Sequence, residues 1–138
     1  MNETLLMIKP DGVKKSLIGE ILNIVEKNGF KITNIKMERF TREKAEKFYE
    51  MHRGKVFFEK LINFMLTGPV VAVRLEGENA VERLRKIVGS TDPEKAEEGS
   101  IRRMFGTNVT VNAVHASDTP ENAEREIRFF FGEEKWVD

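Results

Sequence analysis

His115 is the residue whose surroundings most clearly suggest chemistry. It follows an apolar segment and precedes Ser117-Asp118-Thr119-Pro120, a sequence typical of a helix start. Neutral imidazole is a competent nucleophile near pH 7, and a phosphohistidine would divide one phosphoryl transfer into two easier steps. A helix that begins just after His115 would also offer free N–H groups and a positive dipole end to phosphates. Taken alone, a histidine is more often a surface or capping residue without chemistry.

The motifs that usually hold nucleotide phosphates or metals are absent from the sequence. The chain contains neither GxxxxGK[ST] nor GxGxxG, so phosphates would have to be held by scattered side chains. It has no cysteine, which excludes disulfides, thiolate nucleophiles and cysteine-based zinc sites. With two histidines and no acidic cluster at ligand spacing, no dedicated transition-metal site is expected.

Length and charge narrow the class of protein. The 138 residues are expected to form one domain, over residues 1–138. The 23 basic and 23 acidic residues give no net charge, which argues against specific nucleic-acid binding through a one-sided basic field. No apolar stretch approaches the about 20 residues of a membrane span, and no signal peptide is recognisable. We therefore expect a soluble, cytoplasmic protein that does not bind membranes.

The elements that would position His115 are expected to alternate between strands and helices. Apolar runs predict strands over residues 4–8, 30–40, 70–75 and 108–114, the second with a bulge because its alternation slips once. Helical spacing predicts helices over residues 18–25, 41–51, 58–65 and 80–88, and a last helix from about residue 118 to 130. Residues 90–107 are polar and predict a functional loop. This order favours an α+β fold (an α/β sandwich): a ferredoxin-like, four-stranded antiparallel sheet covered by helices.

The segment around His115 resembles the active-site signature of nucleoside diphosphate kinases, N-x-x-H-[GA]-S-D. Asn112, His115, Ser117 and Asp118 match it in order and spacing. Similar matches cover essentially the whole chain, at Ile8–Gly12, Phe48-Tyr49, His52, Phe57-Phe58, Thr67–Val71, Leu75–Ala80, Arg85, Gly89–Pro93, Ser100–Arg102, Ala123–Ile127 and Phe130-Phe131. The departures from the family pattern are small and lie at Val56, Asp92, Met104 and Ala116.

The resemblance implies an enzyme that transfers the γ-phosphate of a nucleoside triphosphate to a nucleoside diphosphate. His115 would take up the phosphate and pass it on, in a ping-pong sequence through phosphohistidine. Lys9, Arg85 and Arg102 match the cations of the family that surround the phosphates, and the hydroxyl of Thr91 would donate to a phosphate oxygen. Mg²⁺ would arrive on the substrate phosphates, since it usually keeps several waters and needs few protein ligands.

The resemblance also assigns the remaining parts of the site. Four residues match positions of the family that surround the nucleotide: Asn112 at the ribose, Phe57 at the base, and Tyr49 and His52 near the phosphates. Ser117 and Glu126 would support His115, with Glu126 hydrogen-bonded to the imidazole. Members of the family are usually homo-oligomers, and a tetramer or hexamer built of dimers is implied here.

Two other interpretations compete with this one. An RNA-binding module of the same topology would need stacking aromatics on its central strands. The segments 4–8, 70–75 and 109–114 contain no aromatic residue, which disfavours such a module. A catalytically inactive family member that serves as a scaffold is disfavoured because every residue expected to take part in the chemistry is present.

Overall fold

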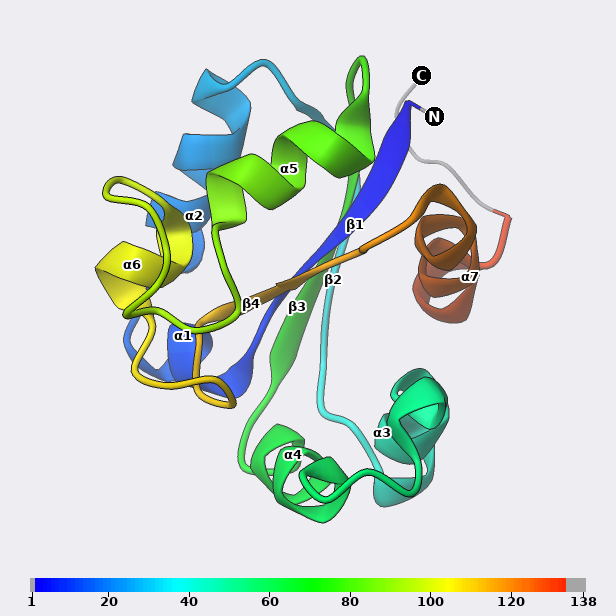
Figure 1. The fold of residues 1–138 in the computed structure, drawn as a ribbon. Coiled ribbons are helices and arrows are strands. Elements are labelled where there is room, and N and C mark those ends of the chain that lie inside the picture. The colour runs from blue at the N-terminus through cyan, green and yellow to red at the C-terminus, as the bar shows by residue number, and fades with distance from the viewer. Residues whose placement is uncertain (1, 134–138) are drawn as a thin grey trace.

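The structure, a computed structural model, describes residues 2–133. In this part of the chain the strands are β1 (Glu3–Ile8), β2 (Lys31–Glu38), β3 (Val70–Glu76) and β4 (Val114–Ala116). They form an antiparallel sheet in the order β2-β3-β1-β4 (Figure 1). The short β4 pairs with β1, and this pairing places His115 opposite Met7.

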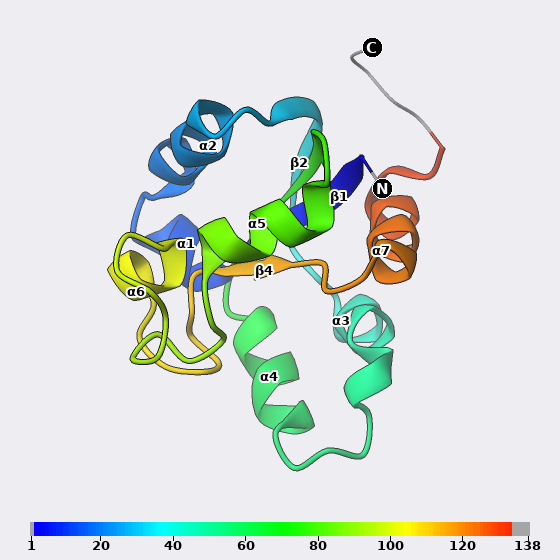
Figure 2. The ribbon, with the colours of Figure 1, turned by 45° about the horizontal axis from the view of Figure 1, so that its top comes forward.

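Helices cover both faces of the sheet. They are α1 (Pro10–Lys14), α2 (Ile18–Lys27), α3 (Arg42–Phe48), α4 (Phe58–Met65), α5 (Ala80–Val88), α6 (Ile101–Phe105) and α7 (Pro120–Phe131), with a short 3₁₀ helix at Glu50–His52. Figures 1 and 2 show α2, α5 and α6 on one side of the sheet and α3, α4 and α7 on the other. The chain is thus layered as helices, sheet and helices.

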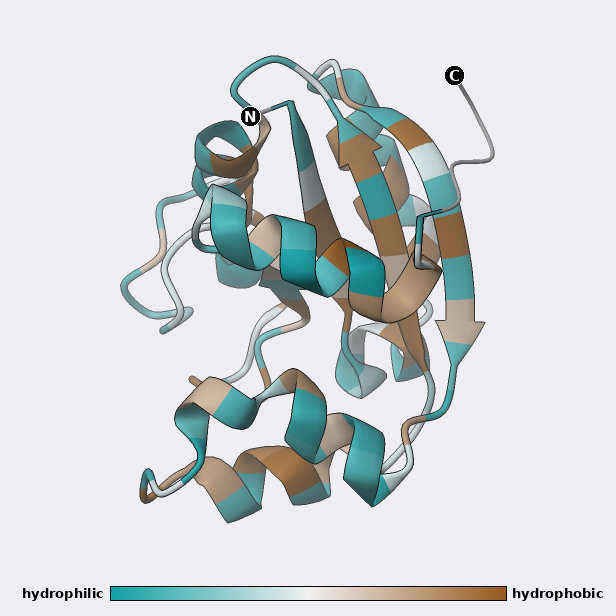
Figure 3. Ribbon diagram, turned by 90° about the vertical axis from the view of Figure 1, so that its right-hand side faces the viewer, coloured by the Kyte–Doolittle hydropathy of each residue, from teal (hydrophilic) through white to brown (hydrophobic). Residues whose placement is uncertain are grey.

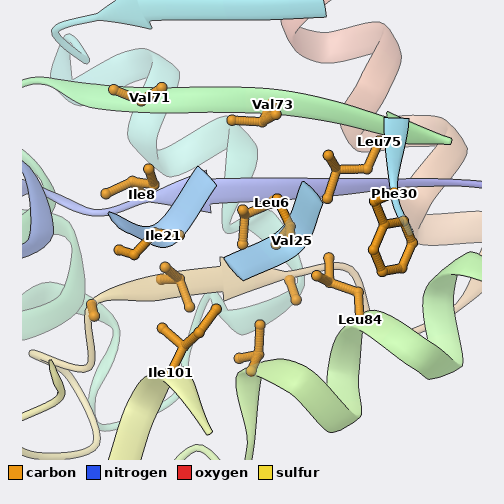
Figure 4. Close-up of a cluster of buried hydrophobic side chains, with 14 of the residues drawn as sticks. Leu6, Ile8, Ile21, Val25, Phe30, Val71, Val73, Leu75, Leu84 and Ile101 are labelled. Carbon is orange, nitrogen blue, oxygen red and sulfur yellow. The ribbon is translucent and has the colours of Figure 1, made fainter. Parts of the chain in front are cut away.

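The two layers of helices bury opposite faces of the same central strand. Successive side chains of a strand point to opposite faces, so β1 divides its apolar residues between two clusters. Leu6 and Ile8 pack with residues of α2, α5 and α6, and Figure 4 shows Ile21, Val25 and Ile101 around them. On the other face, two further β1 residues pack with α3, α4 and α7: Leu5 and Met7. Both faces of the sheet centre are therefore closed to solvent.

The helices are amphipathic, and side-chain caps fix where several of them begin. Figure 3 views the side of the molecule that carries α7, and hydrophilic and hydrophobic residues alternate around the helices there. Thr119 caps α7 because its Oγ1 accepts the N–H of Asn122 at 3.1 Å, and Pro120 suits the first turn. Ser100 caps α6 in the same way through the N–H of Arg103.

The predicted fold class is confirmed, and so is the bulge in β2. The register of β2 against β3 shifts between Ile32 and Asn34, so Thr33 is the extra residue. The predicted strand over residues 108–114 is wrong, because β4 starts only at Val114. Oδ1 of Asn108 accepts the N–H groups of the residues two and three positions later, which folds this segment into a turn.

The other errors concern short helices. The predicted loop over residues 90–107 contains α6, and α1 was not predicted, because five residues are too few to show a helical period. The helix predicted to reach Met51 ends at Phe48 and continues as the 3₁₀ helix. Among residues 2–133, no helix combines the length and apolar character that crossing a membrane requires. Residues 134–138 lie outside the described part, so a single domain over 1–138 stays a prediction.

Candidate active site

A cavity of about 450 Å³ collects side chains from segments that are far apart in the sequence. This volume falls within the range of about 300–1,000 Å³ that is usual for small-molecule sites. Eleven residues were predicted to take part in the site, and all but Ser117 line the cavity: Lys9, Tyr49, His52, Phe57, Arg85, Thr91, Arg102, Asn112, His115 and Glu126.

His115 is oriented by a buried carboxylate. Its Nε2 lies 2.8 Å from Oε1 of Glu126, and the hydroxyl of Ser117 donates to the same oxygen across 2.7 Å. A carboxylate only accepts hydrogen bonds, so the proton of the neutral ring is on Nε2 and Nδ1 keeps a lone pair. Glu126 and Ser117 are buried, whereas the His115 side chain is 21% exposed. The structure therefore presents an imidazole with one fixed tautomer at the cavity wall.

An aromatic ring supports His115 from the side. The centroid of Phe48 lies 5.1 Å from that of the imidazole, in an edge-to-face arrangement. Phe48, the last residue of α3, is almost fully buried and lines the cavity. The sequence showed Phe48 only as part of a motif, and core packing alone would have explained it.

Lys9 follows the last residue of β1 and is buried at the floor of the cavity. Its Nζ donates to the carbonyl of Thr110 across 3.1 Å and to Oδ1 of Asn112 across 3.0 Å. Burial lowers the pKa of Lys9 to about 8; the charge of Arg102 adds to this shift and Asp11 opposes it. The ammonium of Lys9 has three N–H groups, and its hydrogen bonds within residues 2–133 use two of them. One N–H therefore remains to donate into the cavity.

Arg102 and Arg85 bring two further positive charges to the same cavity. Arg102, on α6, donates to the carbonyls of Gly89 at 3.1 Å and Val114 at 2.9 Å. Its Nε is buried without a hydrogen-bond partner among the described residues. The pKa of Arg102 is lowered to about 10, mainly by burial and next by the charge of the neighbouring Arg85, while Tyr49 opposes the shift. Clustered cations that depress one another's pKa are typical of a site that binds an anion.

The amide of Asn112 connects three segments around the cavity. Its Nδ2 donates to the carbonyls of Thr91 at 3.1 Å and Val109 at 3.0 Å, while Oδ1 accepts from Lys9. Both amide protons are therefore engaged, and Oδ1 keeps one lone pair that can accept a ligand hydroxyl. The Thr91 side chain is exposed and lines the cavity.

Two apolar side chains stand at the exposed part of the cavity. Phe57 is 44% exposed and Val109 is 57% exposed, although both line the cavity. The ring centroid of His52 lies 5.3 Å from that of Phe57. Large apolar groups exposed at a cavity mouth offer a flat surface for an aromatic ligand.

Tyr49 lies in the cavity wall, but its hydroxyl has a partner in the core. It donates to Sδ of Met65 across 3.7 Å. Burial raises the pKa of Tyr49 well above its usual value; the charge of Glu126 raises it further and Arg102 opposes the shift. The hydroxyl is therefore neutral, and in this structure it is directed to Met65.

Sequence reasoning assigned no role to several residues that line the cavity. Asp118 accepts the side-chain N–H of Asn122 across 2.6 Å, and this bond is the main cause that lowers the pKa of Asp118. Asp118 belongs to the motif around His115, and Asn122 lies four residues later on α7, so the helical spacing was the available signal. The Thr110 carbonyl that accepts from Lys9 had no sequence signal, because any residue has a carbonyl there.

The structure also bears on the competing RNA-binding interpretation. Such a module stacks bases on aromatics exposed at a sheet face. Here the side chains of β1 and β3 are buried under helices on both faces. The sheet centre therefore has no open face to offer.

Comparison with known proteins shows similarity to one family along nearly the whole chain. The sequence model of the nucleoside diphosphate kinase family matches residues 2–136. The nucleoside diphosphate kinase of Ehrlichia ruminantium is 53% identical over 133 residues, which cover 96% of this chain and 93% of that protein. That of Persephonella marina is 48% identical over 131 residues, covering 95% and 94% of the two chains.

Solved structures show the same similarity in three dimensions. The nucleoside diphosphate kinase of Aquifex aeolicus is 48% identical and superposes with a TM-score of 0.95, with 99% of each chain covered. That of Halobacterium salinarum, solved in complex with CDP, is 38% identical with a TM-score of 0.94 and covers 100% of this chain and 93% of its own.

Proposed function

This chain belongs to the nucleoside diphosphate kinase family, and we propose that it transfers the γ-phosphate of a nucleoside triphosphate to a nucleoside diphosphate through a phosphohistidine at His115. The observation that carries the proposal is a single arrangement. An imidazole fixed by Glu126 lines the same cavity as Lys9, Arg85 and Arg102. A nucleophile that faces clustered cations fits the attack on a phosphate.

The first half of the reaction is an attack by His115 on the donor. The lone pair of Nδ1 forms a bond to the γ-phosphorus, and the bond from phosphorus to the β,γ-bridging oxygen breaks. The leaving diphosphate keeps the electron pair. The phosphorylated ring is then an imidazolium, and the Nε2–H bond to the Glu126 carboxylate stabilises its positive charge.

The second half reverses the first with a different nucleotide. An anionic oxygen of the acceptor's β-phosphate attacks the phosphorus, the phosphorus–nitrogen bond breaks, and the electron pair returns to Nδ1. No proton has to be moved at the reacting atoms in either half. A covalent intermediate of this kind gives ping-pong kinetics.

The cations would stabilise the charge that spreads over the phosphate oxygens during transfer. Lys9 and Arg102 are held by hydrogen bonds before substrate binds, so little reorganisation is needed at the moment of reaction. The remaining N–H of Lys9 would donate to a phosphate oxygen, and so would the Thr91 hydroxyl. Arg85 is exposed on α5 and would reach the phosphates from the open side of the cavity.

The nucleoside would lie toward the mouth of the cavity. Oδ1 of Asn112 would accept a ribose hydroxyl, and the base would stack on Phe57 opposite Val109. A neighbouring Tyr49 would support the site through its ring, because its hydroxyl bonds to Met65. The related Halobacterium salinarum enzyme in complex with CDP supports a diphosphate as ligand.

Mg²⁺ would be carried by the nucleotide phosphates as part of the substrate. Among residues 2–133, no group of three or more histidine and carboxylate side chains forms a metal site. The carboxylates that line the cavity are Glu126, which is engaged with His115, and Asp118, which is bonded to Asn122. Such a donor set fits an ion held mainly by phosphates and water.

A transfer experiment with labelled substrate tests the function directly. The protein is incubated with Mg²⁺, a γ-labelled triphosphate and a diphosphate of another base. The label is expected in the new triphosphate and, without acceptor, on the protein. A protein that releases the label as free phosphate, or never takes it up, is not a nucleoside diphosphate kinase.

We further propose a cytoplasmic homo-oligomer, a tetramer or hexamer built of dimers. On β2, at the edge of the sheet, Ile35 is 52% exposed and Met37 is 56% exposed. Exposed apolar residues on an edge strand favour pairing with another chain. Native mass spectrometry of the wild type and of Ile35→Lys measures this: a smaller assembly in the variant supports the edge as the contact.

A further inference from the structure

Ala113 lies at the centre of a strained turn between Asn112 and β4. Its φ is 75°, in the left-handed region that favours glycine. The N–H of Val114 donates to the carbonyl of Asn112 across 2.9 Å, the bond that closes a three-residue γ-turn. A γ-turn with positive φ is rare and strained, so it persists only where neighbouring groups hold it.

Both backbone polar groups of Ala113 are held by the turn that follows β1. Its N–H donates to Oδ2 of Asp11 across 2.9 Å, and its carbonyl accepts from the backbone N–H of Lys9 across 2.9 Å. Ala113 is fully buried and Asp11 is 8% exposed, so water scarcely competes for these bonds. Of the two contacts, only the one from Asp11 depends on a side chain.

Gly12 allows the two segments to approach this closely. A Cβ at Gly12 would lie 2.8 Å from Cγ2 of Ile8 and 3.0 Å from the carbonyl oxygen of Ala113. A side chain here would push the turn away from α1. The contact between Asp11 and Ala113 therefore depends on a glycine beside it.

The turn fixes groups on both sides of Ala113 that belong to the cavity. Before it, Asn112 bonds to Lys9 Nζ; after it, the carbonyl of Val114 accepts from Arg102 across 2.9 Å, and His115 comes next. A different backbone at Ala113 would displace these groups relative to one another.

Asp11 itself does not line the cavity, and it is not well satisfied where it lies. Its Oδ1 is buried without a hydrogen-bond partner among the described residues. Burying a carboxylate with an unpaired oxygen destabilises a fold. Its hydrogen bond from the N–H of Ala113 gives the carboxylate a structural use, beside the charge attraction by which Asp11 raises the pKa of Lys9.

We propose that Asp11 is a positioning residue, which holds Ala113 in the strained turn and so sets Asn112 and His115 for nucleotide binding and phosphoryl transfer. The inference rests on the proposed function, because the reaction that Asp11 would support is phosphoryl transfer. The strain at Ala113 can be used to test it. Glycine adopts positive φ without the steric penalty of a Cβ, so a glycine at position 113 needs less support from Asp11.

The experiment is a double-mutant cycle with Asp11→Ala, Ala113→Gly and the double variant. Asp11→Ala is expected to lower kcat/KM for transfer by about 10- to 100-fold, the usual effect of removing a group that orients functional residues. In a chain that carries Ala113→Gly, Asp11→Ala should cause a loss of kcat/KM that is at least about fivefold smaller. Equal losses in both chains would overturn the proposal.

Thr41→Ala is the matched control, because it also removes one side-chain acceptor of a backbone N–H, that of Lys44 at the start of α3. It should lower the unfolding midpoint and leave kcat/KM unchanged. If Asp11→Ala behaves in the same way, Asp11 is merely structural. If Asp11→Ala does not fold, Asp11→Asn replaces it in the cycle, with a smaller expected loss, because a neutral amide oxygen accepts a weaker hydrogen bond from Ala113 than a carboxylate does.

ADP affinity, measured by calorimetry, completes the cycle. It should show the same dependence on position 113, because Asn112 is expected to contact the ribose. If the wild type transfers no phosphate, the proposed function fails, and the affinity cycle still decides the role of Asp11. Identical ADP affinity in the wild type and Asp11→Ala, together with unchanged transfer where transfer occurs, would exclude positioning.

Discussion

Nε2 of His115 and Oε1 of Glu126 lie 2.8 Å apart, and that same carboxylate oxygen accepts the hydroxyl of Ser117 at 2.7 Å. This relationship determines which nitrogen can react. Because the carboxylate accepts from Nε2, the lone pair is on Nδ1. The fold builds the pair from β4 and α7, two elements that neighbour each other in the chain.

His115→Ala is expected to abolish transfer while the protein stays folded, since the His115 side chain is partly exposed. In the wild type, brief exposure to ATP and Mg²⁺ without acceptor should leave a phosphoramidate that survives alkali and is lost in acid. Plots of initial rate against both substrates should be parallel, as a covalent intermediate requires. A variant that retained about a hundredth or more of normal turnover would contradict the covalent mechanism, whose removal usually costs far more.

Glu126→Gln is expected to lower kcat by about 10- to 100-fold, a typical cost of losing an orienting partner. The amide is close in shape, but it can donate to Nε2 and leave the proton on Nδ1. Glu124→Gln serves as the control, because Glu124 lies on the same helix and, within residues 2–133, pairs with Arg128 at the surface. Equal rates in the two variants would show that the carboxylate does not orient His115.

Arg102→Ala and Arg85→Ala are each expected to lower kcat/KM by about 100-fold or more, as when one transition-state donor is deleted. Their effects on stability should differ. Arg102 is buried and bonds two carbonyls, so its loss should lower the free energy of unfolding by about 1–3 kcal/mol. Arg85 is exposed, and its loss should change that energy by less than about 0.5 kcal/mol.

Arg103→Ala is the control for the arginine variants, since the side chain of this exposed neighbour of Arg102 donates, among the described residues, to the backbone carbonyl of Glu94. It should leave transfer unchanged. If both cavity arginines can be removed with only a few-fold loss, the phosphates bind elsewhere.

The lowered pKa of Lys9 predicts a loss of activity at alkaline pH. Its pKa is lowered to about 8, first by burial and then by Arg102. Above that pH the free enzyme loses the charge at Lys9, so kcat/KM should fall as pH rises past about 8. Lys9→Arg should keep its charge and lack this decline. A decline that persists unchanged in the arginine variant would belong to another group.

The stability of the protein should change with pH in the opposite direction. The folded pKa of Lys9 lies below the value of 10.5 of the free side chain, so between about 8 and 10.5 the unfolded chain binds more protons. The contribution of Lys9 to stability therefore rises as pH increases through that window. Denaturant titrations of the wild type and Lys9→Met across it should show the rise only in the wild type.

The sequence predicted the fold where apolar runs and helical spacing were clear. β1 and β3 were predicted from continuous apolar runs and the long helices from apolar residues at helical spacing, and their bounds agree within a few residues. It failed at β4, because the side chain of Asn108 accepts a nearby backbone N–H and forms a turn, and because a strand of three residues is too short to show alternation. The helices α1 and α6 were missed because five residues are likewise too few to show a period.

The residues that line the cavity could be predicted where their side chains belong to a recognisable sequence motif. Lys9, Arg102 and His115 belong to such motifs, and the structure brings them together. Contacts made by backbone atoms had no signal in the sequence, as with the Thr110 carbonyl that accepts from Lys9. The positive φ of Ala113 could not be predicted either, because alanine rarely adopts a positive φ and the neighbouring residue types do not indicate one.

The exposed apolar side chains at the cavity mouth predict tolerance toward the base. Recognition of one base needs donors and acceptors fixed at its edge, whereas Phe57 and Val109 offer only apolar surface. Stacking on Phe57 is worth about 1–3 kcal/mol for any base. ATP, GTP, CTP and UTP should therefore serve as donors within about two orders of magnitude of one another, a span of about 3 kcal/mol. Competition assays with mixed triphosphates measure this range.

Phe57→Ala should weaken all four donors alike, mainly through KM, because the ring contacts the base and not the reacting phosphate. Val56→Ala is the matched control, since the Val56 side chain is fully exposed beside Phe57 and does not line the cavity. It should leave every donor unchanged. A preference beyond about a thousandfold for one base exceeds what apolar stacking provides and would reveal a polar contact to the base edge. That contact would also make the Phe57→Ala losses unequal, because the base held by hydrogen bonds would depend least on the ring.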